Sequence, residues 1–112
     1  MTLDIILKTS IACVAVALCC QPALADSTGF DAIHSKIRVG NKMCFDGHSH
    51  GGSGSGATRK IAEMQAIQSW YGYTAGEYGS DWANINKAIK RSMKCSGGGS
   101  NYSCDLEATA CK

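Results

Sequence analysis

Two histidines separated by a single residue are the groups in this sequence best placed to hold a metal ion. His48 and His50 lie in the segment Gly47-His-Ser-His-Gly-Gly52. In an extended segment, residues i and i+2 point to the same side, so both imidazoles can meet one ion, and imidazole is a good ligand for copper and zinc. His34 and Asp46 are candidates to complete the coordination. The alternative interpretation is that these are solvated loop histidines that hold no metal.

Aromatic side chains crowd a short stretch of the chain and form a second candidate site. Aromatic rings can stack on sugars or on the side chains of a protein partner. In a small domain the same rings are also needed for the core, because few residues are available to bury apolar surface. The predicted binding surface consists of Trp70, Tyr73, Tyr78 and Trp82.

Catalysis and nucleic-acid binding find little support in the sequence. It contains no His-Glu-x-x-His motif and no nucleophile elbow, so we expect that the protein is not an enzyme. The formal net charge of +2 is too small to indicate binding to nucleic acid.

Residues 1–25 are typical of a cleavable signal peptide. Lys8 precedes an apolar run from Ile11 to Cys20, and Ala23-Leu24-Ala25 supplies the small residues that a signal peptidase recognises. The run is shorter than the about 20 apolar residues that span a bilayer, and no later segment reaches that length, so we predict no membrane span after cleavage. Residues 26–112 are then a mature domain that is periplasmic or secreted.

Four cysteines remain in residues 26–112, and they are expected to form disulfides. An even number of cysteines in a small exported domain predicts two bridges, and the absence of a Cys-x-x-Cys pair argues against a zinc site built from thiolates. The four are Cys44, Cys95, Cys104 and Cys111. Spacing alone leaves three connectivities open. We predict Cys95 with Cys104 across a hairpin, and Cys44 with Cys111 joining the first strand to the C-terminal residues.

An amphipathic helix is predicted from about residue 57. Apolar side chains recur at helical spacing in two adjacent rows, and the alanines of the second row would let the helix approach a sheet closely. Thr58 or Ser55 can cap its start, and Gly72, Gly76 and Gly79 predict that it breaks in the seventies. The rows are Ile61, Met64, Ile67 and Tyr71, and beside them Ala62, Ala66 and Trp70.

Three strands are predicted to form the sheet on which this helix packs. Residues 35–46 alternate in places and predict a strand bent at Gly40-Asn41, whereas the glycine-rich residues 47–56 are expected to form a flexible loop. Residues 81–95 fit either a helix or a strand, but the turn signal that follows favours a hairpin whose first strand begins near Ala88. The predicted fold class is α+β, a small single domain with one helix on a three-stranded antiparallel sheet in the order β-α-β-β, braced by disulfides.

Several motifs resemble those of a group of small exported proteins of alpha-proteobacteria that have no known activity. The motifs are Ala66-Ile67-x-x-Trp70, Glu77-Tyr78-Gly79-x-x-Trp82, Ala108-x-x-Cys111 and His48-x-His50-x-Gly52, together with Cys95 and Cys104. The likeness covers most of residues 43–111. It implies an exported compartment and the architecture given above, and it implies a role for no particular residue.

We therefore expect a small exported binding module without catalytic activity and without a cofactor. Its partner would be a protein or a polymer of the cell envelope or the extracellular space. The alternative function is a metal-binding protein that holds copper or zinc through His48 and His50.

Overall fold

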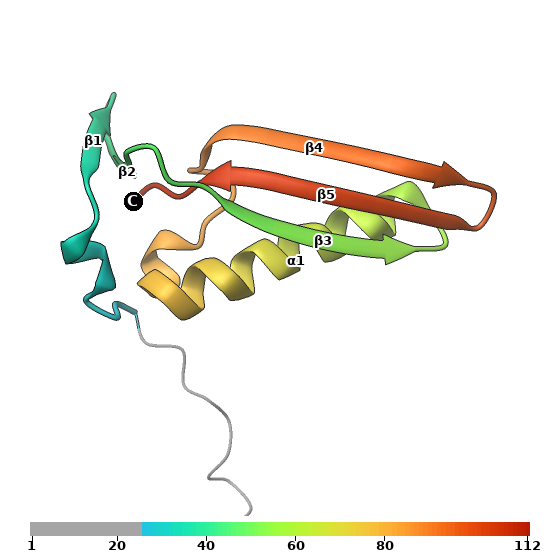
Figure 1. Ribbon diagram of the computed structural model, residues 1–112, viewed down its shortest axis with the longest axis horizontal. Coiled ribbons are helices and arrows are strands. Elements are labelled where there is room, and N and C mark those ends of the chain that lie inside the picture. Colours follow the sequence, from blue (N-terminus) through green and yellow to red (C-terminus); the bar gives the residue numbers. More distant parts are fainter. Residues whose placement is uncertain (1–25) are drawn as a thin grey trace, which may run out of the picture.

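The computed structural model describes residues 26–112, so the predicted signal peptide, residues 1–25, lies outside the described part of the chain. A short 3-10 helix and a small hairpin precede one long helix and a three-stranded sheet (Figure 1). The elements in chain order are η1 (Phe30–Ile33), β1 (Lys36–Val39), β2 (Lys42–Phe45), β3 (His50–Gly56), α1 (Arg59–Tyr78), η2 (Ser80–Trp82), β4 (Ile89–Gly98) and β5 (Asn101–Thr109). No helix within residues 26–112 is long and apolar enough to cross a membrane.

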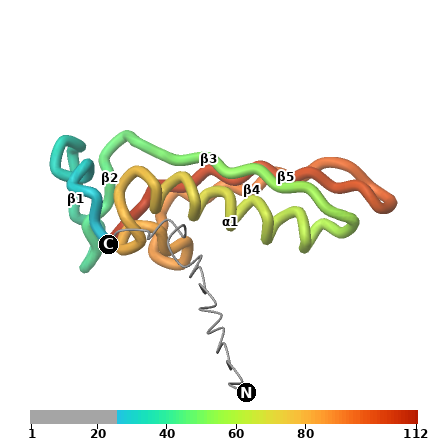
Figure 2. The backbone as a smooth tube through the Cα atoms, turned by 90° about the horizontal axis from the view of Figure 1, so that it is seen from below, coloured from blue at the N-terminus to red at the C-terminus, as the bar shows by residue number. Residues whose placement is uncertain are grey.

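The helix packs on an antiparallel sheet, as the sequence predicts. The strand order is β3-β5-β4, and both Figure 1 and Figure 2 show α1 running along β3 and β5. The α+β fold class is confirmed, but the prediction that residues 35–46 supply the first strand of this sheet is wrong. That segment forms a separate two-stranded sheet, β1–β2, because Gly40 adopts a φ of 61° and lets the chain reverse tightly.

The first strand of the three-stranded sheet, β3, is the segment that the sequence predicts to be a flexible loop. A Cβ atom on Gly52 or Gly54 would overlap backbone atoms of the helix at Ala62 and Ala66. The alternate glycines therefore let the backbones of strand and helix come into contact. A Cβ atom on Gly51, by contrast, would meet one carbonyl oxygen at an ordinary 3.7 Å. The prediction of a loop is wrong because the missing side chains serve close packing.

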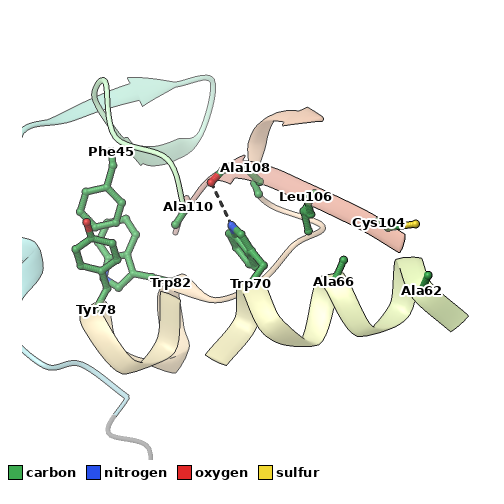
Figure 3. Packing of buried hydrophobic residues seen from close by; sticks show 11 residues of the cluster. Phe45, Ala62, Ala66, Trp70, Tyr78, Trp82, Cys104, Leu106, Ala108 and Ala110 are labelled. Carbon is green, nitrogen blue, oxygen red and sulfur yellow. Dashed lines mark hydrogen bonds between the residues drawn. The ribbon is translucent and has the colours of Figure 1, made fainter. Parts of the chain in front are cut away.

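The helix α1 buries its row of small residues and exposes much of its row of larger ones. Ala62, Ala66 and Trp70 are buried, and the Trp70 indole N–H donates a hydrogen bond of 3.1 Å to the Ala108 carbonyl oxygen (Figure 3). Exposed apolar side chains of the other row are Ile61, Met64 and Tyr71. The two alanines let the helix backbone approach the glycine strand, and the Trp70 indole fills the core beside β5, which explains the choice of face.

Both ends of α1 agree with the sequence prediction. The Thr58 side chain accepts a hydrogen bond from the Ile61 backbone N–H and caps the helix. The helix ends in the seventies as predicted, at the last of the three glycines: α1 continues through Gly72 and Gly76 to Tyr78, and Gly79 is its C-cap. Burial of Thr74, Ala75 and Tyr78 outweighs the cost of about 1 kcal/mol that each internal glycine imposes.

Residues 81–95, whose sequence fits either a helix or a strand, include the start of the β4–β5 hairpin. β4 begins at Ile89, next to the predicted Ala88, and pairs with β5 along its length apart from one irregularity. The strand is preferred because Cys104, Leu106 and Ala108 alternate toward α1 and need a neighbouring strand to complete their sheet.

Two disulfides brace opposite parts of the molecule. Cys95 is bonded to Cys104 across β4 and β5, and Cys44 is bonded to Cys111, which joins β2 to the C-terminal residues. Both predicted pairings are confirmed. Disulfides persist in oxidising compartments, and the two bridges are consistent with such a location.

Candidate metal centre

The three histidines of the chain converge beside the C-terminal end of α1 although they come from separate segments. His34 follows η1, His48 lies between β2 and β3, and His50 is the first residue of β3. The segment that carries His34 is held in place because the Thr28 backbone N–H donates to the Tyr78 carbonyl oxygen at the end of the helix.

Glu77 lies among these histidines and contacts all three. Its carboxylate oxygens are 2.8 Å from His50 Nε2, 3.7 Å from His34 Nε2 and 4.0 Å from His48 Nε2. The Nε2 atoms of His48 and His50 are 3.2 Å apart, and donor atoms of His34, His48 and Glu77 all lie within 4.8 Å of one another. His50 joins this group through its contacts with Glu77 and His48. The separations of 2.8 to 4.0 Å are close to the about 3.3 Å between ligands of a tetrahedral zinc ion.

Two of the imidazoles are oriented through their second ring nitrogen. His34 Nδ1 is 2.8 Å from the Phe30 carbonyl oxygen, which can only accept, so Nδ1 carries the proton and Nε2 of neutral His34 is a free lone pair. His50 Nδ1 is 3.2 Å from the hydroxyl of Thr74, which is buried on α1. Partners of this kind fix the ring orientation of metal-binding histidines.

The members of the cluster differ in exposure, and this difference affects their charge. The His50 side chain is 10% exposed, whereas those of His48 and Glu77 are 42% and 39% exposed. Burial lowers the pKa of His50 below its ordinary value of 6.5; the Glu77 carboxylate opposes this shift, and the neighbouring His48 adds to it. His50 is therefore neutral at pH 7, the state in which imidazole coordinates metals.

The ring of Tyr78 packs against the histidines. His50 stacks on it with ring centroids 5.1 Å apart, His34 meets it edge-on at 5.1 Å, and Phe45 stacks on it at 4.0 Å. Figure 3 shows Tyr78 and Phe45 grouped with Trp82 in the core. Burial and then the charge of Glu77 raise the pKa of the Tyr78 hydroxyl, so it stays protonated, yet it makes no hydrogen bond of normal geometry within residues 26–112.

The structure brings together three of the four residues that the sequence predicts as ligands. His48 and His50 meet as their spacing requires, and His34 joins them because the segment before β1 folds back over the site. Asp46 does not belong to the cluster: it is exposed after β2, where its backbone N–H donates to the Ser35 carbonyl oxygen.

Glu77 is the functional candidate that sequence reasoning misses. The sequence predicts a break in the seventies without fixing which glycine ends the helix, so it leaves the place of Glu77 in space undefined. Continuing the buried row of Ala66 and Trp70 by helical spacing reaches Thr74 and then Glu77 and Tyr78. That periodicity was the available signal, and the glycines at 72 and 76 obscured it.

The four aromatic residues predicted as a binding surface do not form one. Trp70, Tyr78 and Trp82 are buried, and only Tyr73, at 68% exposure, faces solvent. The rings fill the core because the glycines and alanines at the contact between helix and sheet supply little apolar area.

Comparison with protein-family models, with curated proteins and with solved structures finds no match for this chain. The resemblance of its motifs to exported proteins of alpha-proteobacteria therefore stays a prediction. The function is inferred from the geometry of the histidine cluster.

Proposed function

We propose that this protein is an exported, non-catalytic metal-binding protein that holds one Zn²⁺ or Cu²⁺ ion. The ligands would be His34, His48, His50 and Glu77. The observation that carries the proposal is the cluster of their donor atoms around Glu77, drawn from separate segments of the chain. Imidazole nitrogens with one carboxylate oxygen suit both metals. Four protein ligands leave no position for a substrate, which is typical of structural rather than catalytic zinc sites.

The hydrogen bonds of the cluster support a cation at its centre. Because His34 Nδ1 faces a carbonyl oxygen, Nε2 of a neutral His34 presents a lone pair toward the Glu77 carboxylate 3.7 Å away, and a metal ion between them would be coordinated by both. A divalent ion satisfies all four groups at once, whereas a proton joins only two. The Thr74 hydroxyl both donates and accepts, so it remains a partner for His50 Nδ1 whichever ring nitrogen carries the proton.

The compartment proposed here is the periplasm or the extracellular space. Its support is the predicted signal peptide, together with the two disulfides. The competing function, a module whose aromatic surface contacts an envelope partner, is weakened because three of its four rings are buried.

Calorimetric titration with zinc and with copper in a buffer that does not chelate tests the proposal. We expect one ion per chain, and we expect His48→Ala, His50→Ala, His34→Ala and Glu77→Gln each to weaken binding by more than about tenfold. Affinity should also fall as the pH is lowered from about 7 to about 5.5, because protonated imidazoles do not coordinate.

A matched control comes from the same helix. Glu63 is a partly exposed carboxylate of α1 that pairs with Arg59 at 3.0 Å, so Glu63→Gln removes an acidic group without touching the histidines. This variant should bind metal as the wild type does. If the wild type binds zinc and copper no more tightly than a folded variant in which all three histidines are alanine, the proposed function is wrong.

A further inference from the structure

A groove runs along the edge strand β3, beside the metal centre. Its volume is about 420 Å³, within the range of sites that hold small molecules. A smaller cavity of about 330 Å³ at the histidines shares Ser49, Gly51 and Tyr73 with it. The groove therefore adjoins the metal centre but has a lining of its own, contributed by β3, α1, β4 and β5.

The groove follows from the position and composition of β3. Within residues 26–112 this strand pairs only with β5, so its other edge is unpaired there, and its glycines and serines leave the backbone uncovered. Ser69 and Tyr73 of α1 line the groove from the helix side. Asp105 and Glu107 alternate with buried residues of β5, so they lie on the face of the sheet opposite the helix.

Cross-strand pairing arranges the polar groups of the groove in two rows. Asp105 lies between Ser53 and Lys94, and the Ser53 hydroxyl donates to its carboxylate at 2.8 Å. In the next row Glu107 lies between Gly51 and Ser92. Carboxylates that accept hydrogen bonds thus alternate with hydroxyls and an ammonium group that donate them.

The single ring in the lining is exposed rather than buried. Tyr73 is 68% exposed, so its face is available to a ligand that lies along the groove. The only large apolar side chain in the sheet part of the lining is Leu106, which is buried, so an apolar ligand would find little surface. Two carboxylates against one lysine disfavour a polyanion.

We propose that this groove binds a neutral saccharide chain. The Tyr73 ring would stack on a sugar face, while Asp105 and Glu107 would accept hydrogen bonds from sugar hydroxyls. One groove thus combines an exposed aromatic ring with carboxylates and hydroxyls, which matches a ligand whose rings have one apolar face and many hydroxyl edges. The site goes beyond the metal-binding function and does not depend on it.

Titration of the isotope-labelled protein, followed by amide NMR signals, tests this proposal. The probes are tetramers of glucose and of N-acetylglucosamine, up to about 10 mM, with a chelator present. We expect saturable shifts at Gly51, Ser53 and Asp105 with at least one probe. Tyr73→Ala should weaken that binding by about tenfold, whereas Tyr73→Phe, which keeps the ring, should retain it.

Two controls separate the groove from other surfaces. Tyr71 is a partly exposed tyrosine of the same helix, 39% exposed, that does not line the groove, so Tyr71→Ala should bind as the wild type does. His48→Ala, which disrupts the metal centre, should also leave the sugar-induced shifts unchanged. A variant that has lost metal binding but still binds the sugar shows that the two sites fail independently.

The absence of a saturable shift with either tetramer would overturn the proposal. So would shifts that appear only with tetralysine and disappear in high salt and in the Asp105→Asn, Glu107→Gln variant, because that result assigns the groove to a cationic ligand. Binding of a neutral saccharide should persist in high salt, since no net charge is exchanged.

Discussion

His50 is the most buried histidine of the proposed metal centre. Its side chain is 10% exposed, against 26% for His34 and 42% for His48. Burial lowers its pKa in the folded protein, and unfolding restores the ordinary value of 6.5. A histidine of this kind binds protons more readily in the unfolded chain, so acid favours unfolding.

We predict that the metal-free protein loses stability as the pH falls below about 6.5. Between the unfolded pKa and the lowered folded pKa of His50, the unfolded chain binds more protons, so the free energy of unfolding rises with pH across that window. Urea unfolding at several pH values, from about 7.5 to about 5, measures the effect. His50→Gln removes the titrating group and should flatten the dependence; an equal dependence in both proteins would contradict the prediction.

For the histidine cluster, the sequence predicts which residue types could bind an ion better than it predicts which residues come together. The spacing of His48 and His50 predicts that their imidazoles meet, because alternation along an extended segment is local. The contributions of His34 and Glu77 depend on long-range packing, since one needs the lead-in to fold back and the other needs the helix to reach its last turn. No local pattern contains that information.

The close contact between β3 and α1 cannot be predicted from amino-acid composition alone. Glycine-rich segments usually predict loops, because they bury little apolar surface. The informative signal here is periodic. Glycines alternate at 52, 54 and 56, which is the period of a strand, and alanines at 62 and 66 repeat at the spacing of a helix. Two complementary rows of small residues indicate backbones in close contact.

We predict that Gly54→Ala destabilises the protein by about 2 to 3 kcal/mol, near the upper end of what overpacking costs. The added methyl group would overlap backbone atoms of Ala62 and Ala66, which cannot move without displacing the helix. Gly51→Ala is the matched control, because its methyl group meets one atom at 3.7 Å, and it should change stability by less than about 0.5 kcal/mol. Denaturant unfolding of both variants provides the comparison, and similar losses in the two would refute close backbone packing at position 54.

The β1–β2 hairpin and the β4–β5 turn lie at opposite ends of the molecule. The C-terminus and the last turn of α1 lie at the end with the β1–β2 hairpin (Figure 1). Each end has a disulfide. Cys44–Cys111 spans 67 residues of sequence beside the metal centre, and Cys95–Cys104 spans 9 residues within the β4–β5 hairpin.

Removing the two disulfides separately should therefore have different consequences. In the chain-entropy description, closing the longer loop stabilises the fold by about 4 kcal/mol and closing the shorter one by about 2.5 kcal/mol. We predict that replacing Cys44 and Cys111 by alanine lowers the free energy of unfolding by more than replacing Cys95 and Cys104 does. Denaturant unfolding measures both losses.

The same pair of variants should separate stability from metal binding. Cys44 lies in β2, between the segments that carry His34 and His48, and its bridge to Cys111 fixes the hairpin against the C-terminal residues, where backbone hydrogen bonds from Met43 and Phe45 reinforce it. Loss of this bridge frees both histidines relative to Glu77, so zinc affinity should fall by about tenfold or more in protein that is still folded at low temperature. Loss of Cys95–Cys104 leaves the histidine end intact, so its zinc affinity should match the wild type. Equal affinity in the two variants would show that the metal centre does not depend on how the hairpin is held.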